Sequence, residues 1–392
     1  MTAIDLPHPA STVARGEDTT VFVALELSRK SWLVATSAPG ESKISKRTMA
    51  AGDGAGLLVL LAELRDRSDK RIGRQVCVVT IQEAGLDGFW LHRLLEANGI
   101  ESQVVDPASI AVDRRKRRRK TDAIDVEALL RTLMSWARGE RRVCSMVRAP
   151  SPQAEDRRRL SREREALVKE RIQHTNRIKG LLWAQGIADF EPLRPADRAR
   201  FEALTTGDGQ PLPPRLKEEI RRHFERLKTV VTHIEAVEAE RDALVQAATS
   251  ANVSSQAPPA AAVTLRRLKG IGPEFAAVLW FEALFRDFGN RREIASYAGL
   301  TPSPWQSGGL NRDQGIGKAG NRRLRKTMIQ LAWLWVRHQP GSSISRWFVE
   351  RVGTARGRVR RIAIVAVARK LLVALWRFAT QGLVPEGAIM KA

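Results

Sequence analysis

Two aspartates, Asp122 and Asp125, stand three positions apart directly after a run of seven basic residues. Residues at positions i and i+3 share one face of a helix, so these carboxylates can converge on one point. The basic run offers charge that suits the phosphates of nucleic acid. Together they predict divalent metal ions and cleavage of nucleic acid. The run consists of Arg114, Arg115, Lys116, Arg117, Arg118, Arg119 and Lys120.

The elements that must position these aspartates form an α/β domain over residues 20–150. Runs of β-branched and apolar residues predict strands, and helical spacing of apolar residues predicts helices. The predicted order is three strands, helix, strand, helix, strand, helix, which is the order of a ribonuclease-H-like nuclease domain. The strands are predicted over 20–26, 32–37, 43–49, 75–81 and 102–105, and the helices over 54–67, 86–98 and 122–138.

Two glutamates join the aspartates in this domain. Glu26 ends the first predicted strand, and Glu83 follows the fourth. Carboxylates about 5 Å apart repel by about 3 kcal/mol per pair at an effective dielectric of about 20, so a cluster of four requires cations. Two Mg²⁺ ions held there could clamp a scissile phosphate. The alternative is that each acid is an ordinary residue of a strand end or helix start, with Asp122 favouring the positive end of its helix.

Residues 151–247 are predicted to be helical, with a coiled-coil seam. Leu216, Ile220, Phe224, Leu227, Val231 and Ile234 recur every three or four positions. Residues 1–19 read as a polar tail, and 248–264, rich in Ala, Ser and Pro, as a linker. Residues 265–392 are predicted to form a second, mostly helical domain, so the fold class is α/β plus all-α.

A Gly-Ile-Gly-Pro turn follows Lys269, ahead of an apolar helix. Such a turn lets backbone N–H groups approach a phosphate, as in helix-hairpin-helix modules, and Lys269 adds a cation beside it. A plain corner between two helices is the alternative.

Ser307 lies in a stretch where Pro302 and Pro304 exclude a helix. We expect the serine in an exposed loop ringed by cations, where its hydroxyl could attack a phosphodiester. Asn321 is expected to cap the helix that carries Arg322, Arg323, Arg325 and Lys326. A turn residue without chemistry is the alternative. The cations are Arg312, Lys318, Arg322, Arg323, Arg325 and Lys326.

Composition favours a nucleic-acid partner. The formal net charge is +23 and the sequence pI is about 11.1, which points to a polyanion, with an anionic membrane surface as the alternative. The two cysteines exclude a disulfide framework and fit a reducing cytoplasm. The most apolar run, residues 362–378, is interrupted by Arg369 and Lys370, which predicts a buried helix rather than a membrane span.

These motifs in this order resemble the DEDD-type insertion-sequence transposases, the serine-dependent recombinases guided by a bridge RNA. The resemblance rests on Glu83, the Lys-Thr-Asp-Ala-Ile-Asp segment that ends at Asp125, Gly-Ile-Gly-Pro, Tyr-Ala-Gly-Leu-Thr-Pro, Ser307-Gly and Gly-Asn-Arg-Arg-Leu-Arg. It implies a RuvC-like N-terminal domain, a coiled coil and a C-terminal domain with a nucleophilic serine that forms a phosphoserine link to DNA.

The same resemblance implies carboxylate metal ligands and several partners. Glu83, Asp122 and Asp125 would bind Mg²⁺, and a noncoding bridge RNA would pair with target and donor DNA. The working form would be a dimer or tetramer in which the serine of one subunit completes the carboxylate site of another. The implied location is the bacterial cytoplasm, at the nucleoid, with no membrane partner. The family's first carboxylate is aspartate, whereas this chain has Glu26, one methylene longer.

The leading hypothesis is therefore an RNA-guided DNA recombinase. A metal-dependent nuclease or Holliday-junction resolvase, in which Ser307 is only a turn residue, would give hydrolysed ends without a covalent adduct. A non-catalytic nucleic-acid-binding protein would tolerate loss of Asp125. A tyrosine recombinase is disfavoured because Tyr297 is the only tyrosine and no histidine-centred set surrounds it.

Overall fold

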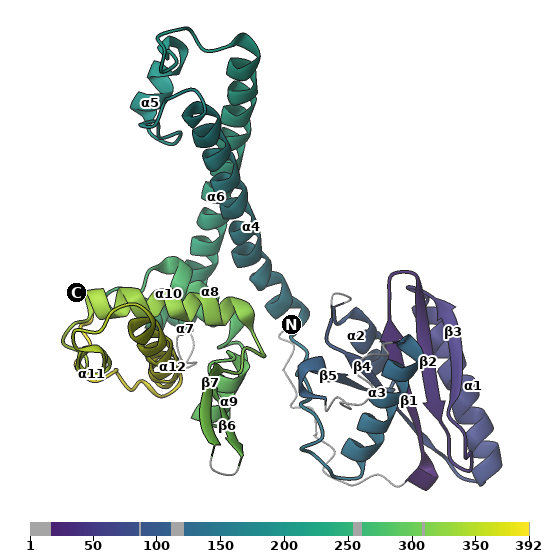
Figure 1. Ribbon diagram of the computed structural model, residues 1–392. Helices are drawn as coiled ribbons and strands as arrows, with labels where there is room; N and C mark the ends of the chain where they lie inside the picture. Colours follow the sequence, from purple (N-terminus) through teal and green to yellow (C-terminus); the bar gives the residue numbers. More distant parts are fainter. Residues whose placement is uncertain (1–16, 86–87, 111–120, 254–260, 308–309, 392) are drawn as a thin grey trace. The chain divides into compact units, whose positions relative to one another are not determined.

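A computed structural model describes residues 17–85, 88–110, 121–253, 261–307 and 310–391 of the chain. The chain divides into two units, residues 1–150 and 151–392, and Figure 1 draws their elements. None of the helices in these described ranges is long and apolar enough to cross a membrane.

The first unit is built on a five-stranded mixed sheet in the order β3-β2-β1-β4-β5. The first three strands pair antiparallel, and β4 and β5 run parallel to β1. This is the ribonuclease-H-like order, so the prediction from element order is confirmed. The strands are β1 (Thr20–Leu27), β2 (Ser31–Ser37), β3 (Ser45–Ala50), β4 (Cys77–Glu83) and β5 (Glu101–Val105).

Helices cover both faces of this sheet. Alternate residues of β1 explain why: Val23 and Leu25 pack against α1 and α2, while Phe22 and Ala24 pack against α3 on the other face. α2 is shorter than predicted, and residues 86–87 lie outside the described ranges. The helices are α1 (Gly54–Ile72), α2 (Trp90–Ala97) and α3 (Asp122–Ala137), with 3₁₀ turns at Glu17–Thr19 and Pro107–Ser109.

The second unit begins with two long helices, α4 (Pro152–Trp183) and α6 (Pro214–Val253), which lie side by side (Figure 1). We call this pair the helical arm. The predicted apolar stripe is confirmed, because Ile220, Leu227 and Ile234 are buried against α4. Between the two helices lie the short α5 (Pro195–Arg200) and a 3₁₀ turn at Phe201–Ala203.

The rest of the second unit is mostly helical around one apolar core. Trp335 of α10 is fully buried there, and so are Leu371, Leu372 and Leu375 of α12, which confirms the predicted buried helix. The elements are α7 (Ala261–Arg266), α8 (Pro273–Glu282), α9 (Arg291–Tyr297), β6 (Pro302–Ser307), β7 (Leu310–Ile316), α10 (Arg322–His338), α11 (Ser343–Val352) and α12 (Arg358–Gln381).

The structure differs from the prediction of a linker over residues 248–264. α6 continues to Val253, and α7 begins at Ala261. Residues 254–260 lie outside the described ranges. The physical reason is the alanine content of both ends, since alanine has the highest helix propensity of any residue.

Candidate active site

Glu26 and Glu83 occupy neighbouring positions at the carboxyl ends of β1 and β4. The last recorded pair in this parallel register is Leu25 with Gln82, so the next residues along each strand are the two glutamates. Both extend the alternation of Phe22 and Ala24 in β1 and of Val79 and Ile81 in β4, which face α3. Both are half-buried. The sequence predicted this juxtaposition, and the register brings the two side chains to one face of the sheet.

α3, which covers that face, begins with the two aspartates. Thr121 precedes the helix in an extended conformation, and its carbonyl accepts the N–H of Ile124 at 2.9 Å and of Asp125 at 3.1 Å. Asp122 is exposed and Asp125 half-buried in the first turn, where carboxylates complement the positive end of the helix. Glu127 on the same helix binds Lys46 of β3 at 2.8 Å, which ties the start of α3 to the sheet.

The donor chemistry of these four carboxylates fits a hard divalent cation. All are oxygen ligands, which Mg²⁺ prefers over nitrogen and sulfur. In the described part of the chain, however, no three His, Cys, Asp or Glu side chains gather as a group that could hold a metal ion. Metal binding by Glu26, Glu83, Asp122 and Asp125 therefore stays a prediction. The basic run from Arg114 to Lys120 lies outside the described residues.

Ser307 ends a strand, where the sequence suggested an irregular loop. β6 and β7 form an antiparallel hairpin in which Ser307 pairs with Leu310. Pro302 and Pro304 are accommodated because Pro302 begins the strand and the register shifts between the two prolines. The expectation of a loop was wrong because prolines exclude a helix but not an edge strand. The side chains of Ser307 and Arg312 lie outside what the structure describes.

The base of this hairpin is fixed by two interlocked segments. Gly299 has φ +64°, and a Cβ there would lie 2.0 Å from the carbonyl oxygen of Ala319. Gly320 has φ +90°, and its Cβ would lie 2.3 Å from the carbonyl oxygen of Tyr297. The N–H of Asn321 donates to that same oxygen at 2.7 Å. Only glycine permits these two segments to approach so closely, so their packing fixes where the hairpin leaves the core.

The cations near the hairpin divide into two groups. Lys318 and Arg322 are exposed, so nucleic-acid binding by these two side chains stays a prediction. Arg325 donates instead to the carbonyl oxygens of Lys318 at 2.7 Å and Ala298 at 3.3 Å, and burial lowers the pKa of its guanidinium, helped by the charge of Arg322. The hydrogen bonds of Arg325 thus brace the loop that follows β7.

Arg323 and Lys326 of α10 bind α4. Glu165 accepts both cations, Arg323 at 2.8 Å and Lys326 at 2.9 Å. Burial opposes the charge on Glu165, but the hydrogen bond from Lys326 and the charge of Arg323 outweigh it, so the pKa of this carboxyl is lowered. These two predicted nucleic-acid-binding residues therefore also join the helical arm to the C-terminal core.

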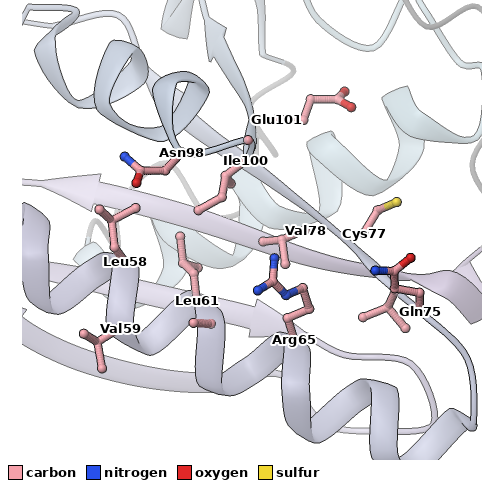
Figure 2. A pocket seen from close by; sticks show the side chains of 13 residues that line it. Leu58, Val59, Leu61, Arg65, Gln75, Cys77, Val78, Asn98, Ile100 and Glu101 are labelled. Carbon is pink, nitrogen blue, oxygen red and sulfur yellow. The ribbon is translucent and has the colours of Figure 1, made fainter.

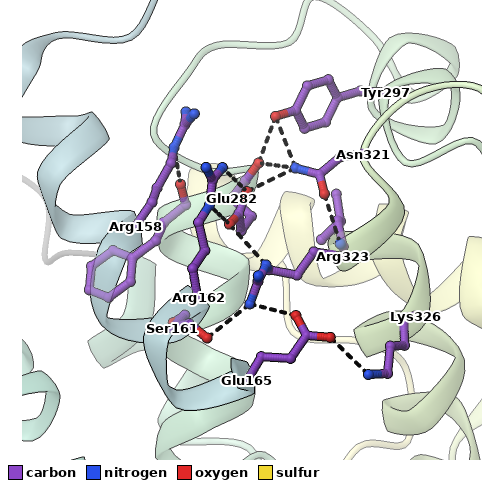
Figure 3. A network of polar contacts seen from close by, with 11 residues as sticks. Arg158, Ser161, Arg162, Glu165, Glu282, Tyr297, Asn321, Arg323 and Lys326 are labelled. Atoms are coloured by element: carbon purple, nitrogen blue, oxygen red, sulfur yellow. Dashed lines mark hydrogen bonds and ion pairs between the residues drawn. The ribbon is translucent and has the colours of Figure 1, made fainter. Parts of the chain in front are cut away.

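Glu282, which the sequence analysis missed, is the centre of this junction (Figure 3). Its carboxylate is almost fully buried at 1% exposure and accepts Arg162 Nε at 3.2 Å and Asn321 Nδ2 at 3.0 Å, with Arg323 Nε at 3.4 Å. Its carbonyl oxygen accepts the Tyr297 hydroxyl at 2.9 Å. One acid thus connects the arm, the N-cap of α10 and the segment that locks the hairpin. The available clue was a glutamate directly after the apolar run 275–281 of α8.

Asn321 has the predicted capping role. Its side-chain oxygen accepts the N–H of Leu324 at 3.0 Å at the start of α10. Its Nδ2 donates to Glu282, so the cap and the buried acid are one unit.

The Gly-Ile-Gly turn joins α7 and α8, as predicted, but the backbone groups of the preceding Lys269 already form hydrogen bonds within the chain. The N–H of Lys269 donates to the carbonyl of Ile389 at 3.0 Å, and its carbonyl accepts Gln339 Nε2 at 2.8 Å. The Lys269 side chain is exposed. The amide of Lys269 is therefore not open to a phosphate, whereas its ammonium is.

A groove of about 670 Å³ lies elsewhere in the first unit (Figure 2). It is lined by α1 and by the starts of β4 and β5, with Leu58, Leu61 and Ile100 among its apolar residues. Cys77, which lines it, is the first residue of β4, whereas Glu83 is the last. The groove therefore lies at the opposite end of the strands from the carboxylates and has no part in their site.

Comparison with known proteins shows the family of this chain. Residues 262–346 match the family described as "Transposase IS116/IS110/IS902 family", and residues 28–184 match a DEDD transposase family of IS110 type. The chain is 55% identical over 97% of both chains to the Sinorhizobium fredii protein y4rJ, which is named as a transposase. It is 24% identical to the transposase of IS1328 from Yersinia enterocolitica, over 79% of this chain and 85% of that one.

A further relative is the transposase of IS1111A from Coxiella burnetii, 26% identical over 78% of each chain. The matched ranges include the α3 aspartates, Glu83 and the hairpin. Since both halves match in the same order and a relative of nearly full length is more than half identical, the chain belongs to the IS110 family of transposases, which are DNA strand-transfer enzymes.

Proposed function

We propose that this transposase cuts and rejoins DNA with Ser307 as the nucleophile, assisted by a carboxylate site made of Glu26, Glu83, Asp122 and Asp125. The observation that carries the proposal is the way the hairpin is attached to the core. β6 ends at Ser307, and the base of the hairpin is fixed by the close packing of Gly299 and Gly320 and by the hydrogen bond of Asn321. A nucleophile gains most from a rigid support, because misplacement by about 1 Å can cost about a hundredfold in rate.

In the proposed step the Ser307 hydroxyl oxygen forms a bond to phosphorus, and the bond from phosphorus to one deoxyribose oxygen breaks. The serine loses its proton and the leaving sugar oxygen gains one, which leaves a phosphoserine ester that a second DNA hydroxyl can resolve. Divalent ions bound by the four carboxylates would offset the charge that develops on the phosphate. Exposed Lys318 and Arg322 beside the hairpin would hold the flanking phosphates.

The further parts of the proposal come from the family resemblance and from charge. A bridge RNA would pair with target and donor DNA, and a dimer or tetramer would bring the serine of one subunit to the carboxylates of another. The net charge of +23 suits a protein that holds two kinds of nucleic acid. The predicted nucleic-acid-binding cations, from Arg114 to Lys120 and around the hairpin, would serve these contacts.

A denaturing gel with end-labelled DNA tests the chemistry. The wild type should give a protein–DNA adduct that resists denaturation, and Ser307→Ala should give none while DNA binding persists. Ser303→Ala is the matched control, since Ser303 lies in the same strand near its base. Hydrolysed ends without adduct would establish the nuclease alternative, and unchanged function in Asp125→Asn would establish the non-catalytic one.

A further inference from the structure

A second cationic surface lies where α11 ends and α12 begins. Five arginines within eleven residues are all exposed there, and we call them the arginine surface: Arg351, Arg356, Arg358, Arg360 and Arg361. We propose that the arginine surface binds the phosphate backbone of nucleic acid. It lies outside the segments that the sequence analysis assigned to nucleic acid.

The charge of this region has almost no internal compensation. Residues 343–380 contain nine basic residues and a single acid, Glu350. Across the described ranges no ion pair joins any of the five arginines to a carboxylate, whereas Arg162 and Arg323, where the helical arm meets the C-terminal core, both form an ion pair with Glu282. Clustered like charges repel unless counterions or a polyanion screen them. An external polyanion is the partner that such a surface fits.

An aromatic ring adjoins the arginine surface. The guanidinium of Arg360 lies 5.2 Å from the ring centre of Trp333, whose side chain on α10 is 37% exposed. Phe348 packs edge-on against the same ring at 6.2 Å and holds it in place. A fixed, partly exposed indole beside arginine can stack on a base or sugar, with about 1–3 kcal/mol per stacked base.

Two of the five arginines lie on the same face of α12. Arg358 and Arg361 are three positions apart in the first turn of α12 and share one face. Their sequence neighbours Val359 and Ile362 are also 48% and 58% exposed, so this turn of the helix faces solvent. Arginine guanidinia bind phosphate oxygens in pairs of hydrogen bonds, which ammonium groups cannot do with the same geometry. This inference rests on DNA binding by the family and not on the role of Ser307.

The test measures binding of the full-length protein to two labelled probes of equal length, duplex DNA and an RNA hairpin. The variant replaces Arg356, Arg358 and Arg361 by alanine. The control replaces Arg222, Arg226 and Lys228 of α6, which are equally exposed and have no recorded ion pair in the described ranges. Fluorescence anisotropy over a salt series gives the affinity and its salt dependence, and the probe that loses more affinity identifies the source of the phosphates.

Loss of three phosphate contacts should lower the magnitude of the log–log salt slope by about 2.7 for duplex DNA, and weaken binding about tenfold to a hundredfold at moderate salt. The control should change little. At low salt and saturating DNA, adduct formation by the variant should equal that of the wild type, which separates this proposal from the serine chemistry. Equal losses in variant and control, or an unchanged slope, would overturn the proposal. A changed mass by light scattering would assign the surface to contacts between protein chains instead.

Discussion

Removal of the Glu282 carboxylate should destabilise the second unit far more than removal of Glu165. Glu282 is buried, and Glu282→Ala would remove the carboxylate that accepts the Asn321 amide and one of the two carboxylates that pair with Arg323, which keeps Glu165. Breaking a buried ion pair costs about 3–5 kcal/mol. Because the side chain of Arg162 is 52% exposed and can be hydrated, we expect the lower end, about 3 kcal/mol. For a unit of this size that corresponds to a fall in melting temperature of about 6–12 °C.

Glu165→Ala is the matched control because it removes an acid that also pairs with Arg323. Glu165 is 25% exposed, and Lys326, its other partner, is 55% exposed. Partly exposed pairs contribute about 0.5 kcal/mol each, so losing both pairs should lower the melting temperature by about 2–4 °C. Thermal unfolding of both full-length variants, followed by circular dichroism, measures the difference.

A functional difference should accompany the thermal one. The Glu282 carboxylate binds Asn321 at the hairpin base, whereas Glu165 binds Arg323 and Lys326. Below the melting range Glu282→Ala should slow adduct formation at saturating DNA, and Glu165→Ala should not. Equal thermal and kinetic effects of the two variants would refute the view that Glu282 links the arm to the hairpin.

Three further predictions concern other contacts. Gly320→Ala should lower stability and adduct formation more than Gly315→Ala in the same melting and gel assays. Both positions have a positive φ that alanine disfavours, but only at Gly320 would the Cβ lie 2.3 Å from a carbonyl oxygen, whereas Gly315 has no atom within 4 Å. Burial, together with the charge of His174, lowers the pKa of His223 below 6.5, and the two Nδ1 atoms lie 3.0 Å apart. The unfolded chain then binds more protons, so the melting temperature of the second unit should fall as the pH drops below about 6.5, and His223→Gln should remove that dependence. Asp125→Asn and chelation by EDTA should each abolish adduct formation while Glu26→Asp retains it; full activity in EDTA would exclude the carboxylate site as a metal site.

The first unit could be predicted well because its information is local. Strand residues alternate between two helical layers, and this period of two is visible in the sequence around Val23 and Leu25. The order of strands then follows from a small set of permitted connections. The position of Glu26 beside Glu83 follows in turn from the pairing of two parallel strands.

The hairpin and the buried junction depend on tertiary contacts that no local pattern reports. Pro304 in a strand is tolerated because of an irregular register with β7. Glu282 is stabilised by Arg162, 120 residues earlier in the chain. The role of Arg325 as a brace could not be separated from a role in phosphate binding, since both use the same guanidinium donors.

The length of α4 gives the junction at Glu282 a mechanical consequence. A helix of 32 residues spans about 48 Å, and Arg158, Arg162 and Glu165, which contact the C-terminal core, all lie in its first half. The helix continues for about 27 Å beyond Glu165, so a tilt of about 5° at this junction would displace its far end by about 2 Å. Conversely, a force on the far end of α4 would act with leverage on the few polar contacts at Arg158, Arg162 and Glu165. These contacts are therefore the ones that bending of the helical arm would strain first.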